Sequence, residues 1–126
     1  MSLILDAGAW IALDRNDRAM WRRLKAAQIA GDVPRSHGGV VGQVWRGRGA
    51  RHALLAQALA GADVRPLDHA LGCAAGELLA VAKGRDVIDA ALVLLAGDGD
   101  QIITSDPDDI ARLVAASGRH LEVVRA

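Results

Sequence analysis

Four aspartates stand at the boundaries of hydrophobic segments, where two of them end short apolar runs and two begin a longer one. They are Asp6, Asp86, Asp89 and Asp106. The carboxyl ends of parallel strands meet at one edge of a sheet, and ligands bind at that edge in open α/β folds. Carboxylates gathered there repel one another unless a cation lies between them. The pattern therefore predicts a divalent metal site, and a metal-dependent phosphodiester nuclease is the leading hypothesis.

Each of these motifs has a simpler structural explanation, because an aspartate at the start of a helix often just accepts a backbone N–H bond. Asp86 and Asp89 are spaced i, i+3, which places their Cβ atoms about 5–6 Å apart on one helical face. Asp106 precedes a proline, which is the sequence of a cap followed by the first helical residue. Three such positions together exceed what capping alone predicts, and Thr104 and Ser105 add hydroxyl groups.

Short apolar runs alternate with helix-spaced patterns along the whole chain. Strands are expected at residues 3–6, 33–35, 64–67, 101–104 and 121–124. Helices are expected at residues 18–30, 39–45, 51–60, 70–83, 86–95 and 108–116, with a short helical turn at 10–13. This alternation is typical of βαβ units, so the expected fold class is α/β, with a parallel sheet covered on both faces.

Length and composition limit the possible protein classes. The chain has 126 residues, the size of one domain, so residues 1–126 are expected to fold as a single unit. Its single cysteine, Cys73, excludes an intrachain disulfide and fits a reducing, cytoplasmic compartment. No apolar run approaches the roughly 18 residues of a membrane span. The first residues also lack the basic region of a signal peptide.

Charge is unevenly distributed although the net charge is zero. The stretch between Asp32 and Asp63 has no acid but four arginines, among them Arg46, Arg48 and Arg51. Such a locally cationic segment can bind a polyanion without the whole chain being basic. The alternative is an ordinary solvated surface in a chain whose coding bias favours arginine.

Other candidate sites are weaker. The histidines lack the spacing of zinc ligands and are expected at the surface or in turns. They are His37, His52, His69 and His120. Cys73 lies on the apolar face of a predicted helix and is expected to be packed there. Gly97-x-Gly99 comes before a predicted strand instead of after one, which argues against a dinucleotide site.

Three segments taken in order resemble a known family. Asp6 ends the first predicted strand, residues 86–91 (DVIDAA) open a helix, and residues 104–109 (TSDPDD) follow a later strand. Together they look like the PIN domain, and in particular the compact VapC-type ribonuclease toxins of toxin–antitoxin pairs. The resemblance covers essentially the whole chain. It implies a three-layer α/β/α fold with a central parallel sheet of about five strands, whose acidic pocket binds Mg²⁺ or Mn²⁺ and cleaves single-stranded RNA.

The resemblance also implies roles for individual residues. Three acids are expected to be both catalytic and metal-binding, namely Asp6, Asp86 and Asp106. Asp89 is expected as an additional metal ligand one helical turn further on. Two hydroxyls would orient Asp106 or a bound water, those of Thr104 and Ser105. The metal would lower the pKa of a water molecule that attacks the RNA phosphate in line.

RNA and protein partners follow from the same resemblance. Three arginines are expected to hold the RNA backbone: Arg46, Arg48 and Arg51. Trp10 or Trp45 could stack on a base, although packing in the core is the alternative for both. A nuclease of this kind implies a cognate antitoxin that covers the acidic pocket, and a homodimer.

One position departs from the family pattern. The family usually carries a glutamate within the segment that here spans residues 39–46, and this chain has Gln43 at the matching position with no acid nearby. Glutamine cannot act as a general base, so one negative charge is missing. Two alternatives stay open: an active nuclease, and a catalytically silent PIN-like RNA-binding or regulatory module. A third is a purely structural domain whose aspartates are helix caps.

Overall fold

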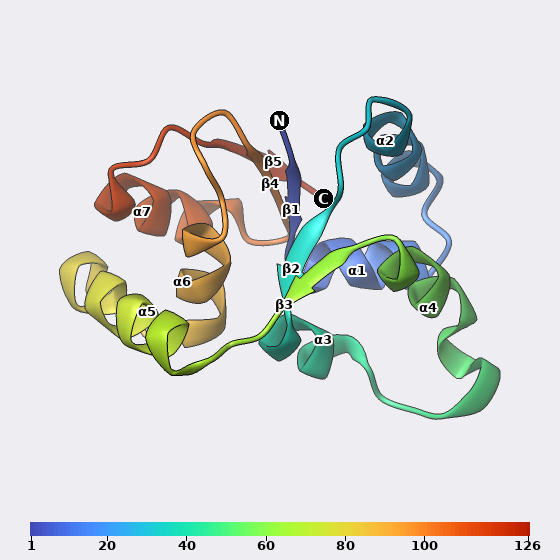
Figure 1. Ribbon diagram of the computed structural model, residues 1–126, viewed down its shortest axis with the longest axis horizontal. Coiled ribbons are helices and arrows are strands. Elements are labelled where there is room, and N and C mark those ends of the chain that lie inside the picture. Colours follow the sequence, from blue (N-terminus) through green and yellow to red (C-terminus); the bar gives the residue numbers. More distant parts are fainter.

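A five-stranded parallel sheet forms the centre of the computed structural model, which describes residues 1–126 (Figure 1). Its strands are β1 (Leu3–Leu5), β2 (Arg35–His37), β3 (Asp63–Arg65), β4 (Gln101–Thr104) and β5 (Glu122–Arg125). They run in the order β3-β2-β1-β4-β5, so β1 lies between β2 and β4. Every residue of β1 is buried, as expected for a central strand of a parallel sheet that is covered on both faces.

Helices cover both faces of this sheet. They are α1 (Ala7–Asp14), α2 (Arg18–Ile29), α3 (Gly38–Val44), α4 (Ala53–Ala60), α5 (His69–Ala82), α6 (Val87–Leu94) and α7 (Pro107–Ser117), with a 3₁₀ helix η1 at Gly49–His52. Figure 1 shows α5, α6 and α7 on one side of the strands and α1, α2 and α4 on the other. The expected three-layer α/β/α architecture is confirmed. No helix in the described residues is long and apolar enough to cross a membrane.

The core consists mainly of aliphatic side chains from the strands and the inward faces of the helices. The fully buried Ile4, Leu5, Ile102 and Ile103 come from the two central strands. Trp10 is also fully buried, on α1. Trp10 is therefore a core residue, and the expectation that it might stack on an RNA base is wrong.

Prolines decide where two strands begin and end. The second strand, expected at 33–35, is found at Arg35–His37, because Pro34 has no N–H to donate to a sheet ladder. The third strand, expected at 64–67, ends at Arg65, directly before Pro66. The shift of β2 matters for function because it moves the carboxyl end of the strand to His37.

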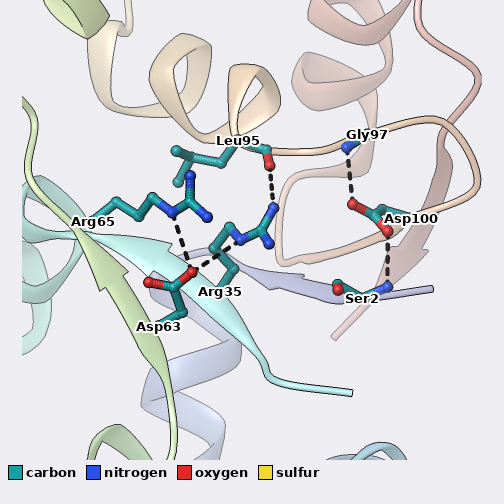
Figure 2. A network of polar contacts seen from close by, with 7 residues as sticks. All are labelled: Ser2, Arg35, Asp63, Arg65, Leu95, Gly97 and Asp100. Carbon is teal, nitrogen blue, oxygen red and sulfur yellow. Dashed lines mark hydrogen bonds and ion pairs between the residues drawn. The ribbon is translucent and has the colours of Figure 1, made fainter. Parts of the chain in front are cut away.

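The amino ends of the strands are joined by a polar network that contains no candidate site residue (Figure 2). Arg35 pairs with Asp63 at 3.4 Å and donates to the Leu95 carbonyl at 2.8 Å. The carboxylate of Asp100 accepts the backbone N–H of Ser2 at 2.8 Å. These contacts fasten strands β1, β2 and β3 and the loop before β4 at the edge opposite to their carboxyl ends. Arg35 thus has a structural role, although it belongs to the acid-free stretch between Asp32 and Asp63.

Candidate carboxylate site

Asp6 is the most firmly held acid of the protein. Its side chain is only 6% exposed, at the junction of β1 and α1. One carboxylate oxygen accepts the Ala9 backbone N–H at 3.0 Å. The other accepts the Thr104 hydroxyl at 2.6 Å and the Ser105 backbone N–H at 3.2 Å. Three donors from α1 and from the end of β4 therefore fix this carboxylate in one orientation.

The close approach of α1 and the loop after β4 requires a glycine. A Cβ atom at Gly8 would collide with the side chain of Ser105. The first turn of α1 therefore packs directly against the loop between β4 and α7, and this contact brings Asp6 beside that loop. Because Asp6 caps α1 from the end of β1, the helix begins at Ala7, well before the helical turn expected at 10–13.

Asp86 and Asp89 occupy the first turn of α6. Asp86 is exposed and accepts the Asp89 backbone N–H at 3.1 Å as the N-cap. Asp89 is half-buried, and its pKa is raised to about 7. Burial is the largest cause of the raised pKa, followed by the negative charges of Asp86, Asp6, Asp106 and Asp109. The two acids thus share one turn but differ in environment.

The charges that raise the pKa of Asp89 identify a group of aspartates that we call the acid cluster. Its members are Asp6, Asp86, Asp89, Asp106 and Asp109. They come from the carboxyl end of β1, the start of α6 and the start of α7. The acids singled out from the sequence therefore lie close enough for their charges to act on Asp89.

Thr104 connects two members of the acid cluster. This fully buried side chain donates its hydroxyl hydrogen to Asp6 and accepts the backbone N–H of Asp106 at 2.9 Å. Because one oxygen makes both contacts, it fixes the position of Asp106 relative to Asp6. Ser105, in contrast, is exposed and contacts Asp6 through its backbone N–H.

Asp106 and Asp109 repeat on α7 the arrangement of the two acids on α6. Asp106 is the N-cap of α7 and accepts the Asp109 backbone N–H at 3.5 Å. A hydrogen bond between the two side chains is the main cause of a raised pKa at Asp106, although the backbone N–H of Asp109 acts in the opposite direction. The hydrogen bond from Arg112 is the main cause of a lowered pKa at Asp109. Sequence reasoning did not assign Asp109 to the site, although its i, i+3 spacing from Asp106 was the available signal.

His37 is the last residue of β2 and contacts both α3 and α6. Its buried ring accepts the Gly39 backbone N–H at 3.1 Å through Nδ1, so it caps α3. Nε2 lies 2.9 Å from the Ile88 carbonyl oxygen and donates to it. Burial lowers the pKa of His37, which favours the neutral form of the ring. The expected surface or turn position for this histidine is wrong, because β2 extends to it and places it against α6.

Gln43 lies one helical turn after Gly39 on α3, so the two residues share a helical face. That face is turned towards α6, since a Cβ atom at Gly39 would lie 2.6 Å from Cδ1 of Ile88. The Gln43 side chain is exposed. All the charges that raise the pKa of Asp89 belong to aspartates outside α3. Gln43 is therefore on the side of α3 that faces the first turn of α6, without contributing a charge.

Residues 46–51, here called the arginine segment, lie beyond the far end of α3, a helix roughly 10 Å long at 1.5 Å per residue. Arg46 is exposed and donates to the Gly42 carbonyl at 2.7 Å. Arg48 and Arg51 are also exposed. These arginines therefore flank the acid cluster at a distance instead of lying within it.

The arginine segment is held to α1 by a second buried histidine. Nδ1 of His52 lies 2.7 Å from the carboxylate of Asp14, and Nε2 accepts the Arg46 backbone N–H at 2.9 Å. The ring centroids of Trp45 and His52 are 5.0 Å apart, and Trp45 is 38% exposed. The surface position expected for His52 is wrong, and so is the packed position expected for Cys73, which is exposed.

The donor set of the acid cluster fits a hard divalent cation, because carboxylate oxygens are what Mg²⁺ and Mn²⁺ prefer. Within the part of the chain that the structure describes, Asp109 is the one member of the acid cluster that forms an ion pair, and its partner is Arg112. Among the described residues, however, no three His, Cys, Asp or Glu side chains already surround a common point where a metal ion would sit. In Asp86 and Asp106 the capping bond occupies only the Oδ1 atom.

The parallel sheet and its helical layers define a PIN-like α/β/α domain. One chain of the crystal structure of VapBC2 from Rickettsia felis, bound to a DNA fragment from their promoter, has the same fold. It superposes with a TM-score of 0.72 over 98% of both chains, at 12% sequence identity. A scan against protein-family models and a search of the curated proteins found no match. The likeness therefore rests on the fold, and it confirms the fold that the sequence resemblance implies.

Proposed function

We propose that this protein is a metal-dependent endoribonuclease of the VapC type, which hydrolyses phosphodiester bonds of single-stranded RNA. The observation that supports the proposal is the acid cluster, in which burial and the charges of four neighbouring aspartates raise the pKa of Asp89 to about 7. Helix capping does not account for Asp89, which lies half-buried among these charges and is not the cap of α6. The fold shared with the VapBC2 structure supports the same reading.

The acids would hold Mg²⁺ or Mn²⁺ through Asp6, Asp86 and Asp106, with Asp89 as an additional ligand. When bound, the metal supplies charge neutralisation at the phosphate and lowers the pKa of water. Asp6 contributes a fixed oxygen, because three donors hold its carboxylate. Thr104 keeps the start of α7 next to Asp6.

The proposal is tested by comparing two matched double variants. Asp6→Asn with Asp106→Asn removes two charges from the acid cluster. Asp17→Asn with Asp68→Asn removes the same charge from the caps of α2 and α5, which lie outside it. Asparagine still caps a helix, so both double variants should fold.

We expect Mg²⁺ or Mn²⁺ to bind to the wild type and to the α2/α5 control, and both to cleave mixed single-stranded RNA. The cluster variant should lose cleavage by about a hundredfold or more, as is common when an electrostatic group of an active site is removed. Calorimetric metal titration and gel assays of cleavage provide the measurements. Equal cleavage by both double variants would contradict the proposal.

A catalytically silent RNA-binding or regulatory module is the second candidate. The observation in its favour is Gln43, which stands uncharged on the face of α3 directed towards α6. If the protein is such a silent module, the wild-type protein should bind RNA and metal but should not cleave RNA. Gln43→Glu should then create a cleavage activity that the wild type lacks. If the wild type is already an active nuclease, the same change should alter the cleavage rate only modestly.

The proposed enzyme also implies partners and a compartment. We propose a cognate antitoxin that covers the acid cluster, a homodimer, and action in the cytoplasm on single-stranded or structured RNA. The VapBC2 structure gives a precedent for a complex, in that case one bound to promoter DNA. Co-purification from native expression, followed by sedimentation analysis, tests both assemblies.

A further inference from the structure

A pocket of about 320 Å³ lies between the end of α5, the start of α6 and α7. We call it the α5–α7 pocket. Two members of the acid cluster on α6 and one on α7 form part of its wall: Asp86, Asp89 and Asp109. The pocket therefore opens directly beside the proposed catalytic centre, and its volume falls in the range of small-molecule sites, which begins at about 300 Å³.

One part of the wall of the α5–α7 pocket is apolar. Leu79 and Ala82 from α5 and Leu113 from α7 line it. Gly84 lies flat against two of these side chains, since a Cβ atom there would be 3.1 Å from Cδ2 of Leu79 and 3.8 Å from Cδ2 of Leu113. A planar ring can pack on the apolar side chains of Leu79, Ala82 and Leu113, which line the pocket.

Cationic side chains line another part of the pocket. Lys83 and Arg85 follow α5, both are exposed, and neither takes part in an ion pair among the described residues. Arg112 lines the pocket from α7 and pairs with Asp109. Lys83 has a left-handed backbone (φ 55°), which ends α5 and turns the chain towards α6. Two unpaired cations are thus placed next to the apolar surface.

We propose that the α5–α7 pocket holds one nucleotide of the RNA strand next to the phosphate to be cleaved. Lys83 and Arg85 bind the phosphate of that nucleotide, and the base packs against Leu79 and Leu113. This inference rests on the proposed ribonuclease function, and it assigns a substrate-binding role to the end of α5. The combination of a cationic wall and an apolar surface is what single-stranded nucleic acid needs, since its backbone and its bases are bound by different groups.

The test uses ¹⁵N-labelled protein in Mg²⁺ with four probes: uridine 5′-monophosphate, adenosine 5′-monophosphate, uridine and inorganic phosphate. Two variants alter the pocket outside the acid cluster. Lys83→Gln with Arg85→Gln removes its free cations, and Ala82→Leu fills its apolar surface. A matched control, Arg22→Gln with Lys25→Gln, removes the same charge from the exposed face of α2.

We expect both mononucleotides to shift the amide resonances of residues 79–85 and Leu113 in the wild type and in the α2 control. The charge variant should weaken nucleotide binding about tenfold or more, because each charge-assisted hydrogen bond contributes on that order. Ala82→Leu should block the nucleotides but still bind inorganic phosphate. Both pocket variants should cleave RNA more slowly than the control.

Three results would overturn the inference. The first is that nucleotides shift resonances outside the pocket, and the second is that the charge variant and the control bind nucleotides equally well. The third is that the pocket variants lose a co-expressed protein partner while the wild type binds no nucleotide in the pocket. The last result would identify the pocket as a protein interface. Cleavage of RNA without pocket shifts would contradict this inference alone. Pocket shifts without cleavage by the wild type would contradict the proposed hydrolysis and leave the nucleotide site standing.

Discussion

Thr104 is the residue on which the geometry of the acid cluster depends most. Its single hydroxyl serves Asp6 as a donor and the Asp106 backbone as an acceptor, at a fully buried position. A hydrogen bond to a charged group contributes about 1.5–3 kcal/mol. The sequence suggested a supporting hydroxyl here, but only the structure shows that it connects two acids.

We predict that Thr104→Val lowers the free energy of unfolding by about 2 kcal/mol, because it keeps the side-chain shape and leaves a buried carboxylate and a backbone N–H without this partner. Metal affinity and RNA cleavage should fall with it. Urea unfolding and the cleavage assay measure the two effects. Ser105→Ala is the control, since Ser105 contacts Asp6 through its backbone; a larger loss in that variant would contradict the assignment.

At the scale of elements, helix starts build the site and buried histidines hold the helices together. The acid cluster depends on three helix N-termini, those of α1, α6 and α7. His37 connects α3 to α6, and His52 connects the arginine segment to α1. The relative positions of these helices therefore depend on side chains that sequence reasoning had placed at the surface.

We predict that His37→Ala destabilises the fold by about 2–4 kcal/mol, because it removes the α3 cap, the bond to the Ile88 carbonyl and a buried ring. The lowered pKa of His37 sets the pH dependence of its contribution. The unfolded chain takes up a proton near pH 6.5 and the folded ring does not, so stability is full above about pH 6.5 and falls below it. Unfolding of both proteins between pH 5 and 8 checks this, and a His37→Ala difference that grows at acid pH would contradict it.

The His52 contacts can be separated by substitution. His52→Gln keeps an acceptor near the Nε2 position for the Arg46 N–H, whereas His52→Asn keeps a donor near Nδ1 for Asp14. If the contact with Arg46 positions the arginine segment, RNA affinity should fall severalfold more in the Asn variant, with similar losses of stability of about 1–2 kcal/mol in both. Fluorescence of Trp45 and RNA titration at several salt concentrations are the measurements. Equal RNA affinity in the two variants would show that the contact only stabilises the fold.

At the scale of the whole molecule, the acid cluster is a source of instability that a cation would relieve. The pKa of Asp89 is raised from 3.8 to about 7. The unfolded chain releases this proton near pH 4 and the folded protein keeps it until about pH 7. The stability of the metal-free protein therefore decreases from pH 4 to pH 7 on account of Asp89.

We predict that Asp89→Asn stabilises the metal-free protein increasingly between pH 4 and 7.5 and has no such effect below pH 4. A shift of one pKa unit corresponds to about 1.4 kcal/mol, and solvent screening at a half-buried group reduces the measured value to a fraction of the full shift. Thermal unfolding with and without Mg²⁺ tests this. Mg²⁺ should raise the Tm of the wild type more than that of the variant, and an equal rise in both would count against Asp89 as a ligand.

The sequence by itself determined the order of the elements, the parallel α/β class and most of the acids of the site. These properties are local: apolar runs predict buried strands, and an aspartate at a strand end or helix start lies at the carboxyl edge wherever the strands are parallel. Even the helix-cap alternative was partly right, since Asp6, Asp86 and Asp106 are all caps. An aspartate can cap a helix and also lie near the other acids, because strand ends and helix starts lie at the same edge of the sheet.

Tertiary structure alone decided which of these groups meet. Asp109 joins the acid cluster because α7 starts beside α6, and His37 becomes a buried brace because β2 is displaced past Pro34. The α5–α7 pocket exists only where three helices pack together. Contacts of this kind join residues far apart in the chain, and their geometry depends on the packing of whole elements. A local pattern such as the i, i+3 spacing of Asp106 and Asp109 shows only that two residues share a helical face.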